Sequence, residues 1–180
     1  MIVFTLDALA DDSHRRHFIE RPEEDGINED YDRYVSPDHE VGRERREKMI
    51  FKHKVTGEIW QPDWRAYYEA CEGDAPIYPV LNCMFQLDFT YEIWSDHCES
   101  SRDKIVGWLH KFMAKSEMPD IKLRPVGDDR PQEELFELWR HQFILSDPGK
   151  NIDMVFSSHG PTIDMFRKFN VFVFDCNQNL

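Results

Sequence analysis

The sequence predicts an α/β protein in which helices cover both faces of a mainly parallel, five-stranded sheet, a three-layer Rossmann-like arrangement. The chain has 180 residues, 41% of them hydrophobic, which suits a single domain with a sizeable core. Residues 1–6 are almost continuously apolar, as in a strand buried on both faces. Residues 89–174 alternate between strand-like and helix-like segments, which is typical of a parallel sheet with crossover helices.

A polar segment interrupts this pattern after the first strand. Residues 22–48 are polar and rich in acidic side chains, and we interpret residues 22–60 as an insertion within a single domain that spans residues 1–180. Polar and apolar residues partly alternate within residues 50–60, which predicts a β-hairpin that turns at Thr56 and Gly57.

Two helices are predicted between this insertion and residue 88. Asp63 is a suitable N-cap, and Trp64 and Tyr67 follow it at helical spacing. The turn-forming residues 72–76 end the first helix, and Pro79 is placed to open the second. The second helix is expected to bury Val80, Leu81, Met84, Phe85 and Leu87.

The rest of the chain is expected to alternate between strands and helices. The expected strands cover residues 89–95, 121–124, 153–156 and 171–174. The expected helices cover residues 102–115, 131–143 and 161–169.

The charge pattern limits the classes of partner. The formal net charge is −13, which argues against direct binding of nucleic acid through phosphate neutralisation. Residues 1–40 carry a net charge of −8, either as a solvated loop or as an acidic face for a basic partner. No apolar run is long enough to span a membrane and no secretory pattern opens the chain, so we expect a cytoplasmic protein.

The four cysteines do not indicate a metal or redox site. Cys71, Cys83, Cys98 and Cys176 include no pair at the spacing of a zinc or thioredoxin-like motif. We expect reduced thiols that pack as small apolar side chains. His97 and Cys98 are neighbours in the sequence, and we interpret this proximity as chance rather than as a reactive pair.

A functional site is expected beyond the carboxyl ends of the strands, where ligands of open α/β sheets bind. His14, His17, His97 and His159 lack metal-ligand spacing, so we interpret them as ordinary surface or packed residues. The polar side chains expected at these strand ends are Thr5, Asp7, Ser95, Asp96, His97, Arg124, Ser157, Ser158 and His159.

The order of several short segments resembles the haloacid dehalogenase (HAD) superfamily, and within it the 3′-phosphatase domain of the phage polynucleotide-kinase type. The resemblance covers nearly the whole chain except about residues 22–60, where such proteins carry a small cap. The segments are residues 5–9, 10–19, 64–71, 75–80, 94–95, 155–159 and 163–167.

The resemblance also implies what the site has lost. Family members attack phosphorus with an aspartate, neutralise the phosphoryl group with a lysine and hold Mg²⁺ with further acids. The matching positions here hold Thr5 in place of the nucleophile, Phe136 in place of the lysine, and Ser157 and Ser158 in place of the metal-binding acids. Asp7 keeps the acid/base position, where it either acts as a general acid and base or satisfies turn amides. Ser95 keeps the second-motif position, where it either binds a phosphate oxygen or caps a helix. We therefore expect a catalytically degenerate phosphatase without a metal or other cofactor.

The expected function is that of an inactive, HAD-like binding protein. By resemblance it is phage-encoded and directed at a host or phage protein in the host cytoplasm. It would contact a protein partner, or itself, through the insertion at residues 22–60. The apolar hairpin residues either pack on the body or form that contact surface, and they are Ile50, Phe51, Val55, Ile59 and Trp60.

Two alternatives remain open from the sequence. The first is a phosphatase with residual or altered activity on nucleotide or polynucleotide 3′-phosphates, which would use Mg²⁺. The second is a nucleotide-binding module without turnover, which would hold its ligand through Ser95 and helix N-termini.

Overall fold

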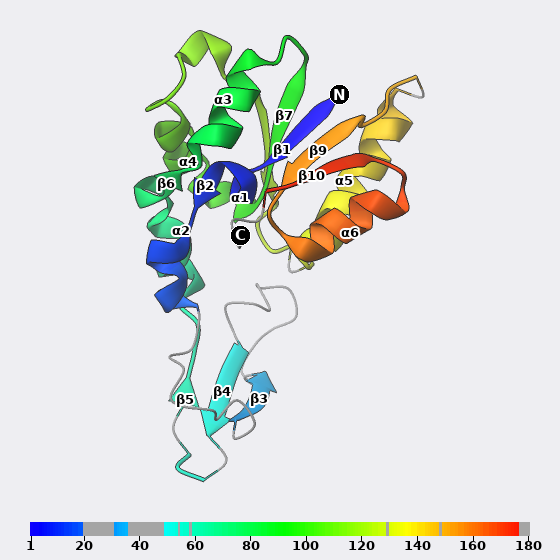
Figure 1. Ribbon diagram of the computed structural model, residues 1–180. Helices are drawn as coiled ribbons and strands as arrows, with labels where there is room; N and C mark the ends of the chain where they lie inside the picture. Colours follow the sequence, from blue (N-terminus) through cyan, green and yellow to red (C-terminus); the bar gives the residue numbers. More distant parts are fainter. Residues whose placement is uncertain are drawn as a thin grey trace.

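The computed structural model describes residues 1–19, 31–35, 49–53, 55–57, 59–128, 130–147 and 149–176. Its centre is a five-stranded sheet in which every neighbouring pair is parallel, in the order β10-β9-β1-β7-β8 (Figure 1). This confirms the predicted α/β class and its mainly parallel sheet. The strands are β1 (Ile2–Thr5), β7 (Tyr91–Cys98), β8 (Asp120–Arg124), β9 (Met154–Ser157) and β10 (Phe172–Asp175).

The chain builds this sheet outward from β1 in both directions. It first adds β7 and β8 on one side of β1, and then crosses over to add β9 and β10 on the other. The crossover makes the space between β1 and β9 the switch point of the sheet, where the connections leave in opposite directions.

Helices cover both faces of the sheet, which gives three layers (Figure 1). On one face lie α1 (Leu6–Leu9), α3 (Tyr78–Gln86) and α4 (Arg102–Leu109). On the other lie α5 (Gln132–Ser146) and α6 (Gly160–Lys168). No helix in the described part of the chain combines the length and the apolar character that crossing a bilayer requires.

Each face of the sheet has its own core, because successive strand residues point to opposite faces. In β1, Phe4 packs with Ile93 and the residues of α3 and α4. Its neighbour Val3 packs on the other side with Trp94 and the residues of α5 and α6. The strands are therefore apolar on both faces, which is the pattern that predicted them.

Local signals place the helix ends. Asp63 caps α2 (Trp64–Glu69), because its side chain accepts the Ala66 amide N–H at 2.8 Å. Pro79 lies in the first turn of α3, as predicted. Asn170 takes a positive φ of 56° after α6, where the Val171 amide bonds back to Phe166.

Three local predictions were wrong. Strand β7 runs from Tyr91 to Cys98 rather than over residues 89–95, so Ser95 and His97 lie within it. Its pairing with β8 is irregular between Ser95 and Cys98, a bulge that the sequence pattern does not reveal. Helix α4 ends at Leu109 because the chain turns there, and Phe85 is 43% exposed rather than buried.

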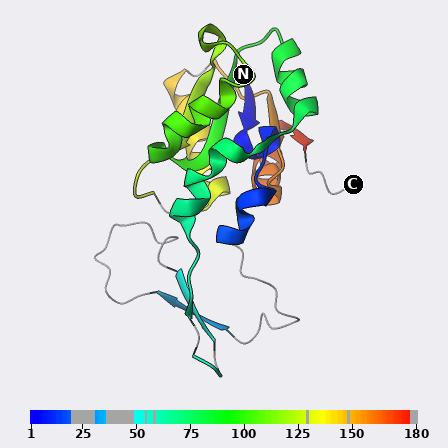
Figure 2. The ribbon, with the colours of Figure 1, turned by 90° about the vertical axis from the view of Figure 1, so that its left-hand side faces the viewer.

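The insertion contains the predicted hairpin. Strands β4 (Met49–His53) and β5 (Ile59–Trp60) pair antiparallel, and β3 (Tyr31–Val35) adds a third strand. Figure 2 shows this small sheet beyond the end of the main body. Val55 and Ile59 are exposed, whereas the side chains of Ile50 and Phe51 and most of the acidic positions between residues 20 and 48 lie outside the described part.

The described segments that flank the insertion contact each other. The Asp63 amide donates to the Phe18 carbonyl at 2.8 Å. Phe18 ends the short 3₁₀ segment η1 (Ser13–Phe18), which follows β2 (Ala10–Asp11). Strand β2 pairs antiparallel with β6 (Ala75–Pro76), and this pairing fixes η1 beside the carboxyl end of the large sheet.

Candidate functional site

A cleft of about 690 Å³ opens at the carboxyl ends of the central strands. It lies at the switch point of the sheet, so its position agrees with the expectation for an open α/β fold. Six of the polar side chains expected at the strand ends line it, namely Asp7, Ser95, Asp96, His97, Ser158 and His159. Its lining also includes Asp11, Asp12, Arg15, Arg16, Tyr67, Asp74, Gln132 and Glu133.

Asp7 is held by a ring of donors, which we call the Asp7 cluster: Asp7, Gln132, Ser157 and Ser158. The amide of Ser158 donates to Asp7 Oδ2 at 2.8 Å, and the hydroxyls of Ser158 and Ser157 lie 2.9 and 3.2 Å from the same oxygen. The Ser158 hydroxyl also lies 2.8 Å from the Asp7 carbonyl oxygen. Gln132 Nε2 approaches the other carboxylate oxygen, Oδ1, at 3.4 Å. Both oxygens of the carboxylate therefore have donors from within the protein.

Two other predicted site residues do not face the cleft. Thr5 is fully buried, and its hydroxyl donates to the Phe156 carbonyl at 3.0 Å. Phe136 is fully buried in the core between α5 and the sheet, where its ring centroid is 5.8 Å from that of Trp94 and 5.2 Å from that of Trp139. The structure thus brings Asp7, Ser157 and Ser158 together and leaves Phe136 apart.

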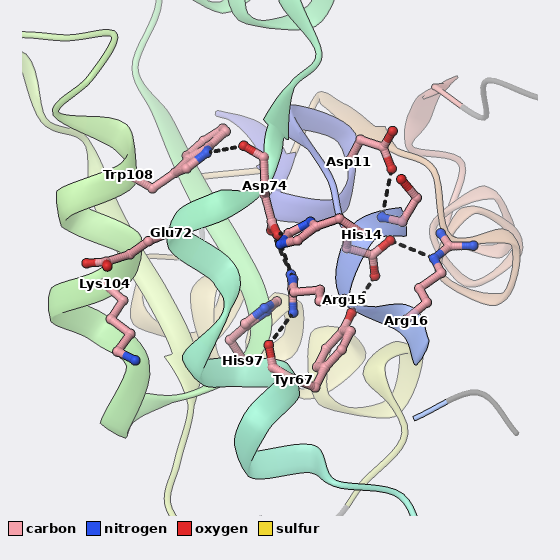
Figure 3. Close-up of polar contacts among 12 residues, drawn as sticks. Asp11, His14, Arg15, Arg16, Tyr67, Glu72, Asp74, His97, Lys104 and Trp108 are labelled. Carbon is pink, nitrogen blue, oxygen red and sulfur yellow. Dashed lines mark hydrogen bonds and ion pairs between the residues drawn. The ribbon is translucent and has the colours of Figure 1, made fainter. Parts of the chain in front are cut away.

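A buried arginine forms one wall of the cleft. Arg15 is 1% exposed and makes a two-point ion pair with Asp74, with Nε–Oδ1 and Nη2–Oδ2 distances of 2.6 and 2.7 Å (Figure 3). Its guanidinium carbon lies 4.0 Å from the ring centroid of Tyr67, and Nη1 donates to the Tyr67 carbonyl at 3.1 Å. Burial alone lowers the pKa of Arg15, but the bonded Asp74 carboxylate outweighs it and raises that pKa.

Asp12 completes this network. It accepts the Tyr67 phenol hydrogen on Oδ2 and the Arg16 Nε–H on Oδ1, the latter at 2.7 Å. Burial opposes ionisation of Asp12, yet the hydrogen bonds from Tyr67 and Arg16 hold its pKa below the usual range. Burial raises the pKa of the Tyr67 phenol, so that group stays protonated and donates. Each arginine of the cleft therefore already has a carboxylate partner.

His97 lies at the bulge of β7 with its ring buried. Ser95 Oγ accepts the His97 amide N–H at 3.1 Å and lies 2.8 Å from His97 Nδ1. The predicted helix-cap role of Ser95 was therefore wrong: its hydroxyl stabilises the bulge. Nε2 of His97 is buried and has no hydrogen-bond partner among the described residues. Burial lowers the pKa of His97 to about 4, so the ring is neutral at physiological pH.

The four histidines do not form one cluster. His97 and His159 line the cleft, whereas His14 lies 3.6 Å from Asp74, and the His17 ring contacts the Phe18 ring in a tilted arrangement. In the described part of the chain, no group of three or more His, Cys, Asp and Glu side chains is placed to share a metal ion.

The Arg15 network was not found from the sequence. Arg15 and Asp74 are separated by 59 positions, and nothing in a local pattern shows that two charged residues so far apart are both buried. A local signal for this network was the position of Arg15 soon after the first strand, close to the expected site.

The cleft carries an excess of negative charge. Its lining contains six carboxylate side chains but only two arginines, and both arginines are paired with carboxylates of the same lining. The environment is therefore better matched to a cation than to a phosphate.

No protein-family model, curated protein or solved structure matches this chain.

Proposed function

We propose that this protein is a non-catalytic binding protein built on a scaffold similar to that of the haloacid dehalogenase phosphatases. The observation that carries the proposal is the Asp7 cluster. Residues that stand where such phosphatases keep metal-binding acids, Ser157 and Ser158, donate instead to the Asp7 carboxylate. The cluster satisfies itself and leaves little capacity for chemistry.

The other positions of the expected machinery support the same conclusion. Phosphoryl transfer through a covalent intermediate needs a nucleophile that faces the substrate. Thr5 is fully buried and its hydroxyl is bonded to a backbone carbonyl, so it is not free to attack. Phe136 takes the place of a cationic side chain and packs in the core. The described cleft offers no unpaired arginine or lysine to neutralise a phosphoryl group.

The donor set also does not fit Mg²⁺. This ion requires near-octahedral oxygen ligands and is usually held by more than one carboxylate together with substrate oxygens and water. Asp7 is the single carboxylate of the cluster, and its oxygens already accept hydrogen bonds from two serines and Gln132. The proposed function therefore does not require a bound metal ion.

Binding is supported by the cleft itself. The Asp7 cluster closes one corner, but a volume of about 690 Å³ remains, within the range of cavities that hold ligands. The acidic lining and the net charge of −13 favour a basic protein partner over nucleic acid. The resemblance to phage phosphatase domains supports a phage origin and a partner in the host cytoplasm.

Phosphate release tests the catalytic half of this proposal. We expect no release above buffer from a 3′-phosphorylated oligonucleotide or from a nitrophenyl phosphate in the presence of Mg²⁺. The variant Asp7→Asn should give the same result, because the carboxylate takes no part in turnover. An active phosphatase assayed in parallel confirms that the substrates are competent.

Turnover that depends on both Mg²⁺ and Asp7 contradicts the proposal. It would mean that the cluster opens and that Asp7 acts as an acid or a ligand, which would favour a residual phosphatase.

A further inference from the structure

We infer that the cleft binds a peptide segment that carries a lysine or arginine side chain, with the basic group among the carboxylates and a peptide carbonyl on His97. This inference rests on the proposed binding function and names the chemistry of its partner. Two independent observations lead to it: the surplus of carboxylates and the unpaired ring nitrogen of His97.

The first observation concerns the carboxylates that are not neutralised by the arginines. Asp74 is paired with Arg15 and Asp12 with Arg16, whereas Asp11 and Glu133 lie at the cleft without an arginine partner among the described residues. Asp11 accepts only the Ser13 amide, at 2.9 Å, and Glu133 makes no hydrogen bond or ion pair there. Both are partly exposed, so a cation that enters from solvent can reach them.

These two acids come from different elements. Asp11 ends β2, and Glu133 lies in the first turn of α5. Asp96, from β7, adds a third carboxylate to the lining, although it also lies 3.7 Å from Arg124. These carboxylates line one cleft from separate elements, so the cleft attracts a cationic side chain such as an ammonium or guanidinium group.

The second observation is the buried nitrogen of His97. The neutral ring has one proton, and the Ser95 hydroxyl has no other acceptor among the described residues. We therefore assign the Ser95 hydroxyl as the donor to Nδ1, which leaves the ring proton on Nε2. Nε2–H is then a buried donor without a partner, and His97 lines the cleft. A ligand with a hydrogen-bond acceptor would satisfy it.

A basic peptide supplies both kinds of group. Its ammonium or guanidinium group matches the carboxylates, and its backbone carbonyl accepts from Nε2–H. A simple polyamine supplies the charge but no carbonyl. A nucleotide supplies acceptors, but its phosphates would meet the carboxylates.

Calorimetric titration tests the inference. The probes are a capped hexapeptide of alternating lysine and glycine, the same peptide with glutamate in place of lysine, spermidine, and a 3′-phosphorylated dinucleotide. We expect saturable binding of the lysine peptide, weaker binding of spermidine, and none of the other two.

Variants locate the binding site. Glu133→Gln and Asp11→Asn should each weaken binding of the lysine peptide by about fivefold, the upper range for a solvated ion pair. Glu134→Gln is the matched control, because Glu134 is exposed on the same helix turn and does not line the cleft. His97→Phe should weaken binding of the lysine peptide but not binding of spermidine. Circular dichroism confirms that this variant is folded.

The inference is overturned if the lysine peptide does not bind, or if the dinucleotide binds instead. It is also overturned if spermidine binds as tightly as the lysine peptide, or if Glu134→Gln weakens binding of the peptide as much as Glu133→Gln does. Phosphate release measured on the same samples reports separately on the proposed function. If the titration shows no peptide binding and no phosphate is released, the peptide ligand is rejected and the non-catalytic assignment is retained.

Discussion

At the residue scale, two charged side chains of the cleft are satisfied in different ways: Asp7 is partly buried, and Arg15 is almost completely buried. Asp7 is held by neutral hydroxyls and an amide, whereas Arg15 is held by an opposite charge. The first arrangement fixes a carboxylate in place, and the second fixes the wall beside it. Both depend on partners that are distant in sequence. The expectation that strand ends meet predicted that Asp7 lies near Ser157 and Ser158, whereas no sequence pattern predicted the pair of Arg15 and Asp74.

Removal of Arg15 should be far more destabilising than removal of an exposed arginine. Arg15→Ala leaves Asp74 as a buried carboxylate without its partner, and we expect a loss of about 3–5 kcal/mol in the free energy of unfolding. Urea unfolding followed by circular dichroism measures it. Arg65→Ala, whose side chain is 84% exposed beside Glu69, is the control and should leave the midpoint nearly unchanged. Equal effects of the two substitutions would mean that Arg15 is solvated in solution.

His97 should make the protein sensitive to mild acid. Its pKa is about 4 in the folded protein against 6.5 in the unfolded chain, so below pH 6.5 the unfolded chain takes up a proton that the folded one does not. This contribution to stability is complete above pH 6.5 and declines by about 3 kcal/mol as the pH falls to 4.

The thermal midpoint between pH 7 and pH 4.5 checks this prediction. His97→Phe should flatten the decline, whereas His110→Gln, at an exposed position on the C-terminal side of α4, should not. A decline that is the same in both variants would show that other groups cause it.

At the element scale, the packing of α5 on the sheet explains why one expected site residue lies elsewhere. Phe136 points into the core together with Trp139, while Gln132, one turn earlier, reaches Asp7 at the cleft. Matching a short segment to a family pattern predicts how far along a helix a residue lies. The packing of the helix decides which of its faces carries that residue. The side chain of α5 that contacts Asp7 is therefore the amide of Gln132, and the Phe136 position supplies no cationic group to the cleft.

Phe136→Ala should therefore act on stability and not on binding. Loss of a fully buried phenylalanine is expected to reduce the free energy of unfolding by about 3–5 kcal/mol. Chemical unfolding measures it, with Phe89→Ala, at a 69% exposed position, as the control. A neutral result for Phe136→Ala would place this residue outside the core and reopen its assignment to the site.

The strands and helices were predicted better than the site. Apolar runs such as residues 1–6 and the Asp63 cap are local signals, and the structure confirms the elements that they predicted. The bulge of β7 depends on a bond between Ser95 and His97 within the strand, which shifts the strand end beyond the predicted one. The Arg15 wall depends on a contact across 59 positions, which no local pattern contains.

At the scale of the whole molecule, the sheet order concentrates the polar residues at one edge. Because β1 lies between β7 and β9, the residues that follow β1 and β9 meet there with the bulge of β7. This arrangement places the Asp7 cluster beside an acidic cleft, and the proposed binding function rests on that juxtaposition.

A crystal structure of the protein grown with Mg²⁺ and a phosphate mimic such as beryllium fluoride tests this account most directly. We expect Asp7 to keep its hydrogen bonds with Ser157 and Ser158, and no ion or mimic to be bound beside it. An octahedral Mg²⁺ on the Asp7 carboxylate, or a mimic bonded to the Thr5 hydroxyl, would contradict the account.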